Sequence, residues 1–252
     1  MRKLPLILCL IAFSSSINLL AQDFGLMRSL NATIDVVQIK EGLNYGLVFN
    51  GPVFRFTYRR SWEIDKKELL YEGSFGAGPL TTRGMIGLNF KFKPVDLLFN
   101  VYKRNRKISY MAGPWLKMEY NYQLYPHIHS GYSFHYTNYT AGFGLTAKLH
   151  TDDAYIRLSW KNSLFGLVSR PPLYRNPYFF ELSLGTYFKD QHGVFEFGSF
   201  NLYNNSVVEV LFVRPDHPRL GYAYTFEYFS YSQVPKLKAL THSFTLFFYP
   251  KS

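Results

Sequence analysis

The chain contains a single cysteine, Cys9, which lies in an N-terminal stretch with the features of a leader. The residues after this stretch therefore offer no disulfide, no thiolate zinc ligand and no cysteine nucleophile. A lack of cysteine suits a protein exposed to an oxidising envelope compartment. Long hydrophobic runs are also missing after residue 22, and the mean hydropathy of the chain is slightly negative. Because a spanning helix needs about 20 apolar residues, membrane crossing by helices is excluded for this part of the sequence.

Linkers, repeats and clusters of charge are equally scarce. No Ser-, Gly- or Pro-rich linker divides the residues after position 22, so we predict one domain over 23–252. Lys and Arg number 28 against 17 Asp and Glu, which gives a formal charge of +11. The basic residues are spread singly along the chain, which argues against nucleic-acid binding. This charge favours anionic lipopolysaccharide or small anionic solutes as partners.

Residues 1–22 are predicted to be a secretory signal peptide. Arg2 and Lys3 supply a charged start, residues 4–13 form an apolar run, and a small polar stretch leads to Leu-Leu-Ala-Gln before Asp23. The apolar run is too short to cross a hydrocarbon core of about 30 Å as a helix. The ending before Asp23 resembles the leaders of envelope proteins from Bacteroidota.

What the chain has in abundance is aromatic residues, at 19% of its length. They alternate with polar residues at a period of two, which is typical of β-strands with one apolar and one polar face. In the segment 53–64 the apolar face carries Phe54, Phe56, Tyr58, Arg60, Trp62 and Ile64, and the polar face carries Val53, Arg55, Thr57, Arg59, Ser61 and Glu63. The same pattern recurs along most of the chain, and this recurrence predicts a transmembrane β-barrel with lipid outside and a polar lumen inside.

Fourteen segments show strand-like patterns: 30–37, 44–49, 52–63, 67–76, 84–93, 96–103, 108–122, 132–150, 154–162, 178–188, 194–203, 207–214, 220–230 and 238–249. The dipeptide Asn50-Gly51 predicts a two-residue hairpin, and Pro94 predicts a turn. Short connections at 151–153 and 190–193 and longer ones at 123–131 and 163–176 match the alternation of turns and loops in such barrels. Because bacterial barrels have an even strand number, we expect about 12 strands within a range of 10 to 14.

These features together resemble outer-membrane β-barrel proteins as a class, over nearly the whole of residues 23–252. The resemblance implies an all-β, transmembrane, antiparallel up-and-down barrel in the bacterial outer membrane. It also implies contact with outer-membrane lipids and lipopolysaccharide, and with the insertion machinery, for which the aromatic final strand Phe244–Tyr249 resembles an assembly signal. The alternative fold is a secreted β-sandwich, but several segments exceed the usual strand length of a sandwich and carry tyrosines near their ends.

The alternation also predicts which side chains line the lumen. One wall is expected to be basic and the other acidic, so that a solute between them would feel a transverse electric field. The lumen candidates are Arg55, Arg59, Lys91, Lys117, Arg157, Glu181, Glu196, Glu209 and Glu227. This arrangement favours a small porin-like channel or a solute-binding barrel. The alternative is a static network of internal ion pairs that fills a narrow barrel, as in a structural, assembly or secretion-associated protein.

Other residue patterns point to loop functions or to chemistry. Arg170, Tyr174 and Arg175 in the longest loop are candidates for gripping phosphate or sugar acids. Ser133 and His135 share one face of a strand, the spacing that a lipid-acting barrel hydrolase would need, but no third catalytic member is evident. His127 and His129 would share a side in an extended loop, but no nearby carboxylate or thiolate completes a metal shell. We therefore assign no catalytic residue, no metal site and no cofactor.

Overall fold

The computed structural model describes residues 27–42, 46–64, 67–104, 108–125, 132–151, 154–170, 195–214, 220–233 and 236–249. The predicted signal peptide lies outside these residues. The described part forms eleven β-strands: β1 Met27–Glu41, β2 Val48–Ile64, β3 Lys67–Thr82, β4 Met85–Arg104, β5 Ile108–Tyr125, β6 Tyr132–His150, β7 Tyr155–Ser169, β8 Phe195–Ser199, β9 Tyr203–Val213, β10 Leu220–Tyr231 and β11 Leu237–Phe248. It contains no helix of a length and apolarity that would let it cross a membrane.

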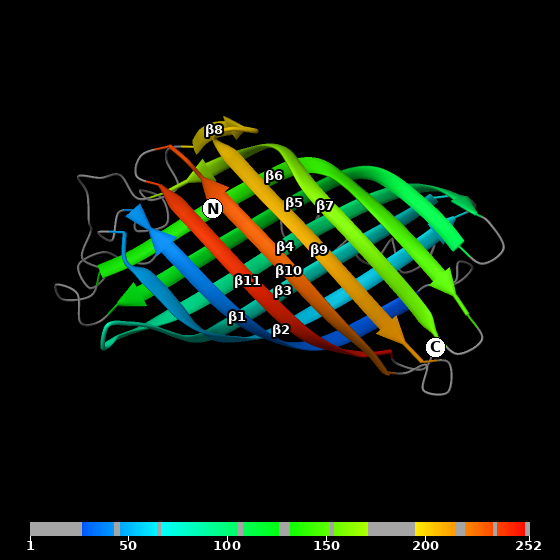
Figure 1. Cartoon of the computed structure of the whole chain (residues 1–252), viewed down its shortest axis with the longest axis horizontal. Helices are drawn as coiled ribbons and strands as arrows, with labels where there is room; N and C mark the ends of the chain where they lie inside the picture. The colour runs from blue at the N-terminus through cyan, green and yellow to red at the C-terminus, as the bar shows by residue number, and fades with distance from the viewer. Residues whose placement is uncertain are drawn as a thin grey trace, which may run out of the picture.

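Ten of these strands close into an antiparallel barrel (Figure 1). β1 pairs with β11 from Leu30 to Glu41 and so joins the first strand to the last. The remaining neighbours follow the chain, except that β7 pairs with β9. β8 lies outside this closed wall and pairs with the part of β7 that extends beyond β9. The predicted all-β, antiparallel barrel is therefore confirmed, and its ten wall strands lie within the expected range.

The two ends of the barrel differ in their connections. We call the end with the β1–β2, β3–β4, β5–β6, β7–β9 and β10–β11 connections the loop end, and the end where β1 starts and β11 finishes the turn end. The predicted long loop 163–176 was partly wrong, because residues 163–169 continue β7. Residues 171–176 and the predicted short connection 190–193 lie outside the described part.

Two predicted chain reversals were wrong. Asn50-Gly51 lies inside β2, because the glycine is needed for close packing against β3: a Cβ at Gly51 would lie 1.9 Å from the carbonyl oxygen of Pro79. Pro94 lies inside β4, at a register shift between Phe92 and Val95, and its carbonyl accepts a hydrogen bond from the Tyr71 hydroxyl at 2.9 Å. A proline without an amide donor is tolerated where the ladder is already interrupted.

These corrections account for the strand number. Residues 48–49 of the first of these segments lie in the same strand, β2, as segment 52–63, and residues 85–93 lie in the same strand, β4, as segment 96–103. Segment 194–203 contains β8 and only the first residue of β9, while segment 178–188 lies outside the described residues. The fourteen segments thus correspond to a wall of ten strands, within the expected range of 10 to 14.

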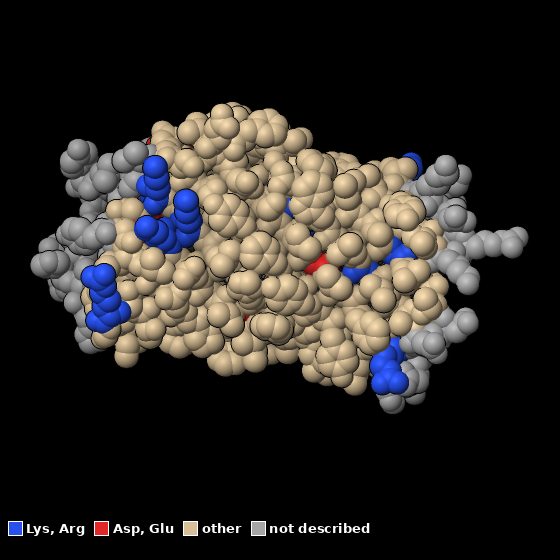
Figure 2. Space-filling view, viewed as in Figure 1, with Lys and Arg blue, Asp and Glu red and all other residues tan. Residues whose placement is uncertain are grey.

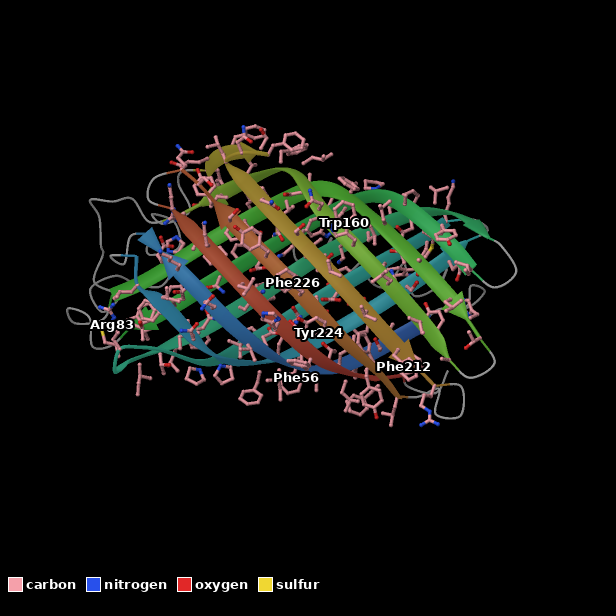
Figure 3. The ribbon with its side chains drawn as sticks, in the orientation of Figure 1. Phe56, Arg83, Trp160, Phe212, Tyr224 and Phe226 are labelled. Atoms are coloured by element: carbon pink, nitrogen blue, oxygen red, sulfur yellow. The ribbon has the colours of Figure 1, made fainter. Side chains whose placement is uncertain are left out.

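The wall is inverted relative to a soluble protein. Large hydrophobic side chains such as Phe54 and Phe56 project outward and are 57% and 73% exposed, while the alternate position Arg59 is buried. Figure 2 shows a surface on which charged side chains are confined mainly to the two ends, and Figure 3 shows Phe56 and Phe212 projecting from the outside of the wall. Among the described residues, buried polar and charged residues outnumber buried hydrophobic ones.

Candidate functional site

The interior of the barrel is the candidate site, and it is filled in three layers. The layer nearest the loop end is apolar, and we call it the apolar cap. It consists of Val37, Ile39, Phe49, Val53, Leu80, Tyr125, Tyr136, Val168, Tyr203, Phe229, Tyr231, Leu237 and Ala239. Its aromatic rings are in close contact: Phe49 and Tyr125 have ring centroids 4.2 Å apart, and Tyr136 stacks on Phe229 at 5.3 Å. The cap therefore closes the loop end of the lumen with packed side chains.

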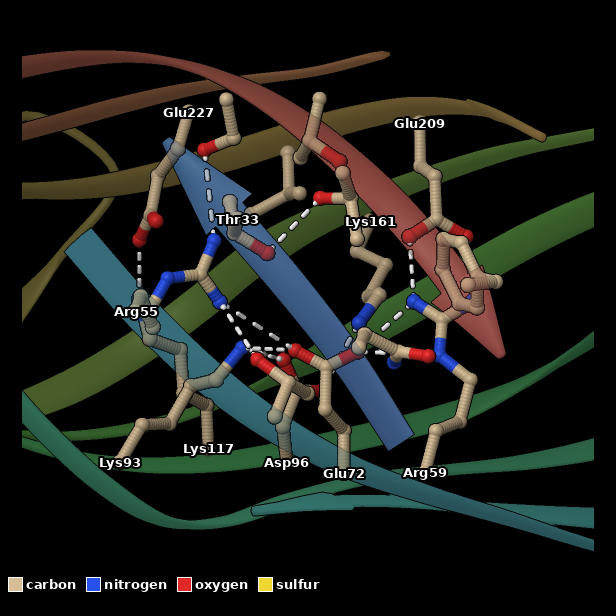
Figure 4. A pocket seen from close by; sticks show the side chains of 17 residues that line it. Thr33, Arg55, Arg59, Glu72, Lys93, Asp96, Lys117, Lys161, Glu209 and Glu227 are labelled. Carbon is tan, nitrogen blue, oxygen red and sulfur yellow. Dashed lines mark hydrogen bonds and ion pairs between the residues drawn. The ribbon is translucent and has the colours of Figure 1, made fainter. Parts of the chain in front are cut away.

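The middle layer is a network of buried ion pairs, which we call the central network. It contains six basic side chains and six carboxylates: Arg55, Arg59, Lys91, Lys93, Lys117 and Lys161, and Asp35, Glu72, Asp96, Glu119, Glu209 and Glu227. These residues come from β1, β2, β3, β4, β5, β7, β9 and β10, so that the network ties strands on opposite sides of the barrel (Figure 4). The two signs balance, which a buried layer requires because an unpaired charge there is costly.

Glu72 on β3 is the hub of the larger half of the network. It accepts hydrogen bonds from Arg59 at 2.7 Å and from Lys93 at 2.5 Å, and Arg55 lies 3.8 Å away. Each of these cations also contacts a second carboxylate. Arg55 donates two hydrogen bonds to Asp35 at 2.8 and 2.9 Å, the fork geometry that makes arginine–carboxylate pairs strong, and Arg59 pairs with Glu209.

Asp96 extends this half of the network to β7. Its carboxylate accepts from Lys93 at 3.2 Å, from Lys161 at 2.8 Å and from the indole nitrogen of Trp115 at 2.9 Å. Lys93 and Asp96 both point inward although they are three residues apart. The register shift around Pro94 explains this, because one extra residue restores the inward phase.

The smaller half contains Lys91, Lys117, Glu119 and Glu227. Lys117 contacts Glu119 at 2.6 Å and also pairs with Glu227, while Lys91 lies 3.2 Å from Glu227 and 3.6 Å from Glu119. Glu227 on β10 thus bridges to β4 and β5 across the lumen. Each half of the network contains equal numbers of the two signs.

Little free space remains among these side chains. The cavity lined by Arg55, Glu72, Lys117, Glu209 and Glu227 has a volume of about 30 Å³. At about 10–15 Å³ for each water molecule, this space holds about two waters. This cavity, as the described residues line it, is therefore too small for a solute of ordinary size.

The layer nearest the turn end is mixed. Glu68 on β3 accepts hydrogen bonds from Lys148 at 3.0 Å and from the Asn100 amide at 3.1 Å, and Arg157 lies 3.5 Å away. On the side of this cluster that faces the loop end, Trp115 packs with Leu70, Leu98 and Val207. A second apolar group, Leu211, Val213, Ala223 and Phe247, lines the neighbouring wall. Side chains thus fill the lumen along its length within the described residues.

Comparison with known proteins identifies a fold but no family. No protein-family model and no curated protein matches the chain. Among solved structures, the chain matches the outer membrane protease OmpT of Escherichia coli with 7% identity over 89% of this chain and 96% of OmpT, at a TM-score of 0.54. This chain has the fold of an outer-membrane β-barrel. The translocator domain of the autotransporter NalP from Neisseria meningitidis matches with 5% identity over 92% of this chain and 91% of that domain, at a TM-score of 0.47. At these identities the likeness concerns the fold alone.

The barrel interior contains most of the residues predicted to line it. Side chains of Arg55, Arg59, Lys91, Lys117, Arg157, Glu209 and Glu227 all point inward and form ion pairs there. The expected separation into a basic and an acidic wall was wrong. Carboxylates on β1, β3, β4 and β5 lie between the basic residues, because a buried cation needs an anion within contact distance.

One predicted acidic residue is not among the buried residues of the interior. Glu196 lies on β8, outside the closed wall, where it is exposed and accepts a hydrogen bond from the Tyr231 hydroxyl. The prediction failed because β8 has the alternation of a wall strand but pairs only with the end of β7. Glu181 lies outside the described residues.

Among the inward residues that the sequence analysis did not single out are several carboxylates and one lysine. These are Asp35, Glu68, Glu72, Asp96, Glu119 and Lys161. Alternation could have found Glu72, since it opposes the outward face of Leu69, Tyr71 and Phe75 on the predicted strand. Asp96 was hidden by the turn wrongly placed at Pro94.

Arg170 forms a bridge between the end of β7 and the end of β1. Arg170 pairs with Glu41 at the end of β1, and its guanidinium lies 5.9 Å from the ring centroid of Tyr231. Its predicted role as a loop ligand stays a prediction. Tyr174 and Arg175 lie outside the described residues.

The residues considered for catalysis and metal binding are only partly described. His135 is on the outward side of β6, opposite Tyr122, and is buried. The side chain of Ser133 and residues 127 and 129 lie outside the described part. His242 and Ser243 face opposite sides of β11: His242 shares a hydrogen bond with the Tyr224 hydroxyl at 2.7 Å on the outer face, and Ser243 lies inside near Arg55. The described residues include no group of three or more His, Cys, Asp or Glu that could hold a metal ion.

Proposed function

We propose that this protein is a sealed barrel of the bacterial outer membrane, a membrane-embedded scaffold that does not conduct solutes in its resting form. The observation that carries this proposal is the interior, where the apolar cap and the charge-balanced central network leave a cavity of only about 30 Å³. A ten-stranded wall is narrow enough for side chains to fill it. Its interactions are then made through the outer face and the two ends.

The outer face supports placement in a membrane. Along β1 the outward side chains are Arg28, Leu30, Ala32, Ile34, Val36, Gln38 and Lys40. The twelve steps from Arg28 to Lys40 span about 40 Å along the strand, or about 30 Å in depth for a strand tilted by about 40°. This depth is close to the hydrocarbon thickness of a bilayer. A basic residue at each end of an apolar row is the arrangement expected of a strand that crosses a membrane.

The proposed orientation follows from the connections. Barrels of the bacterial outer membrane have short turns in the periplasm and longer loops outside. The longest connection, from β7 to β9, lies at the loop end, which on this proposal faces the exterior. The outward row of β11, with Phe244 and Phe248 exposed, is available to the insertion machinery and to outer-membrane lipids as partners.

The channel hypothesis fits the interior less well. An open lumen would require Arg55, Arg59, Lys91, Lys117, Arg157, Glu209 and Glu227 to face water, but each is engaged in an ion pair. A small anionic solute would have to displace these carboxylates from their cations, and the cavity that the described residues line beside them has a volume of only about 30 Å³. A lipid hydrolase would act at Ser133 and His135, for which the described residues show no catalytic arrangement.

Conductance measurements test the sealed barrel. We expect refolded protein to shift its gel migration on heating, which shows a folded barrel, and to give no stable current steps in planar bilayers. A fourfold variant truncates side chains of both the apolar cap and the central network: Phe49→Ala/Tyr125→Ala/Arg59→Ser/Glu209→Ser. We expect this variant to give current steps in planar bilayers. The second pair of changes is neutral in net charge, so the remaining network stays balanced. Stable current steps from the unaltered protein would refute the proposal.

A further inference from the structure

Three lysines gather on the outer face at the loop end, at the junction of β1 and β11. Lys40 and Lys238 are directly opposite each other in the ladder that closes the barrel. Lys236 lies two residues before Lys238, and its carbonyl accepts a hydrogen bond from the Gly42 amide at 2.7 Å, which holds it beside the end of β1. All three are exposed. We call them the rim lysines, and Figure 2 shows basic side chains grouped at this end of the visible face.

Within the part of the chain that the structure describes, the rim lysines have no carboxylate partner. Like charges directly opposite on neighbouring strands destabilise the pair. None of the three forms an ion pair with a carboxylate of the described residues, whereas the buried lysines of the central network each do. An anion outside the protein would remove the repulsion between Lys40 and Lys238.

The depth of the rim lysines identifies the kind of anion. They lie just beyond the apolar row of β1, at the level expected for lipid headgroups of the leaflet at the loop end. Below them, β1 and β11 together with the flanking strands β2 and β10 carry an apolar groove of about 560 Å³, lined by Ala32, Ile34, Phe54, Phe56, Tyr222, Phe244 and Leu246. Ile34 is six residues from Lys40, which corresponds to about 20 Å along the strand and about 16 Å in depth. An amphiphile with an anionic head and several acyl chains matches this combination of cations above and groove below.

We propose that the rim lysines bind the phosphate groups of lipid A, the phosphorylated glycolipid of the outer leaflet, with its acyl chains against the groove between β2, β1 and β11. This inference rests on the proposed location in the outer membrane and on its orientation with the loop end outside. Lysine ammonium groups bind phosphate oxygens as point charges, with strength that falls as salt rises. Several such contacts together fix one lipid at the closure of the barrel, where the first and last strands meet.

The test compares lipid binding by folded protein and its variants. The protein is refolded in detergent micelles, checked for heat-modifiable migration, and titrated with purified phosphorylated lipid A, with dephosphorylated lipid A and with phosphatidylglycerol, while intact complexes are measured by mass spectrometry. We expect Lys40→Gln/Lys236→Gln/Lys238→Gln to bind phosphorylated lipid A about tenfold more weakly, which corresponds to about 1.4 kcal/mol. The charge-conserving variant with three arginines should retain binding.

A matched control comes from the same end of the barrel. Arg83 is exposed at the turn between β3 and β4, away from the β1–β11 junction, and Arg83→Gln should leave the affinity unchanged. Equal binding by the Gln triple variant and the unaltered protein overturns the proposal, as does unaltered protein that prefers phosphatidylglycerol. If the Gln triple variant does not fold, unaltered protein at low and high NaCl still decides: salt-independent lipid A binding overturns the proposal.

The outcome is separable from that of the proposed function. A chain that fails to give a heat-modifiable barrel contradicts the location on which both proposals rest. A chain that folds as a barrel but shows no preference for phosphorylated lipid A contradicts the rim site alone. Conductance of the unaltered barrel bears on the sealed interior and leaves the rim site untouched.

Discussion

Replacement of Glu72 by glutamine is the most direct test of the central network. Glu72 contacts Arg59, Lys93 and Arg55, and the change removes its charge with little loss of volume. The network then holds six cations against five carboxylates, since the unaltered protein holds six of each. The excess charge is buried among strands, where water cannot solvate it.

The expected magnitude follows from what remains. Removing one partner of a buried ion pair costs about 3–5 kcal/mol when the other charge is left uncompensated. Here Arg55 keeps Asp35, Arg59 keeps Glu209 and Lys93 keeps Asp96, so we expect the lower end of this range. A loss of about 3 kcal/mol lowers the folding equilibrium constant by about a hundredfold.

A second variant separates charge imbalance from lost contacts. In Glu72→Gln/Lys93→Gln the larger half of the network keeps three complete pairs, Arg55–Asp35, Arg59–Glu209 and Lys161–Asp96. We therefore expect this double variant to be more stable than Glu72→Gln alone, although it lacks one more ionic group. Glu63→Gln, at an exposed position near the turn end, should change stability by no more than about 0.5 kcal/mol.

The assay is unfolding by urea from lipid vesicles, followed by tryptophan fluorescence. Trp115 is fully buried and donates its indole hydrogen to Asp96, so it reports on the network directly. Trp62 and Trp160 are replaced by phenylalanine in every variant to isolate this signal. The reasoning is refuted if Glu72→Gln matches its parent within about 1 kcal/mol, or if the double variant is the less stable of the two.

Two further predictions concern the wall. Ile34 lies midway between Arg28 and Lys40 on the outward row of β1. We therefore expect Ile34→Arg to destabilise the vesicle-inserted barrel by about 2–4 kcal/mol and Ile34→Leu to be nearly neutral. Equal unfolding midpoints of these two variants in urea would contradict the membrane placement. Gly51→Val should lower the yield of heat-modifiable protein, because its Cβ would lie 1.9 Å from the carbonyl oxygen of Pro79, whereas Ala32→Val on the outward face should refold normally.

The sequence predicted the alternation of the wall strands more accurately than the positions of the turns. A period of two recurs along the wall strands. On β2 it places Phe54, Phe56 and Tyr58 outside and Arg55 and Arg59 inside. This phase is strongly determined, since a shift of one residue would move every side chain to the opposite face. Local signals were less informative. Asn50-Gly51 has the composition of a hairpin, but the glycine serves close packing against Pro79, a contact with a residue far along the chain. This role of the glycine can be recognised only when the pairing of β2 with β3 is known.

The partners within the network could not be read from alternation alone. Alternation says that Arg59 and Glu72 both point inward, but the register of β2 against β3, with Arg59 opposite Glu72, is what brings them into contact. The pairing of Arg59 with Glu209 also requires the barrel to close, since these residues are 150 positions apart. The prediction of a basic wall and an acidic wall was wrong because it used only the order of the strands in the chain. The distribution of charge is set by strand register and by closure of the barrel.

The arrangement of the interior has a consequence for how the barrel reaches its folded state. A buried ion pair is expensive to form, and its attraction repays the loss of hydration only when geometry and hydrogen bonds are complete. In this barrel completeness depends on closure, because Arg59 reaches Glu209 and Lys117 reaches Glu227 only once β9 and β10 lie opposite β2 and β5. A partly assembled sheet would leave these charges solvated, and so would gain little from the network. The ion pairs therefore stabilise the closed ten-stranded barrel specifically. The outward aromatic rows need no closure, so they would favour contact with an apolar environment from the first strands onward.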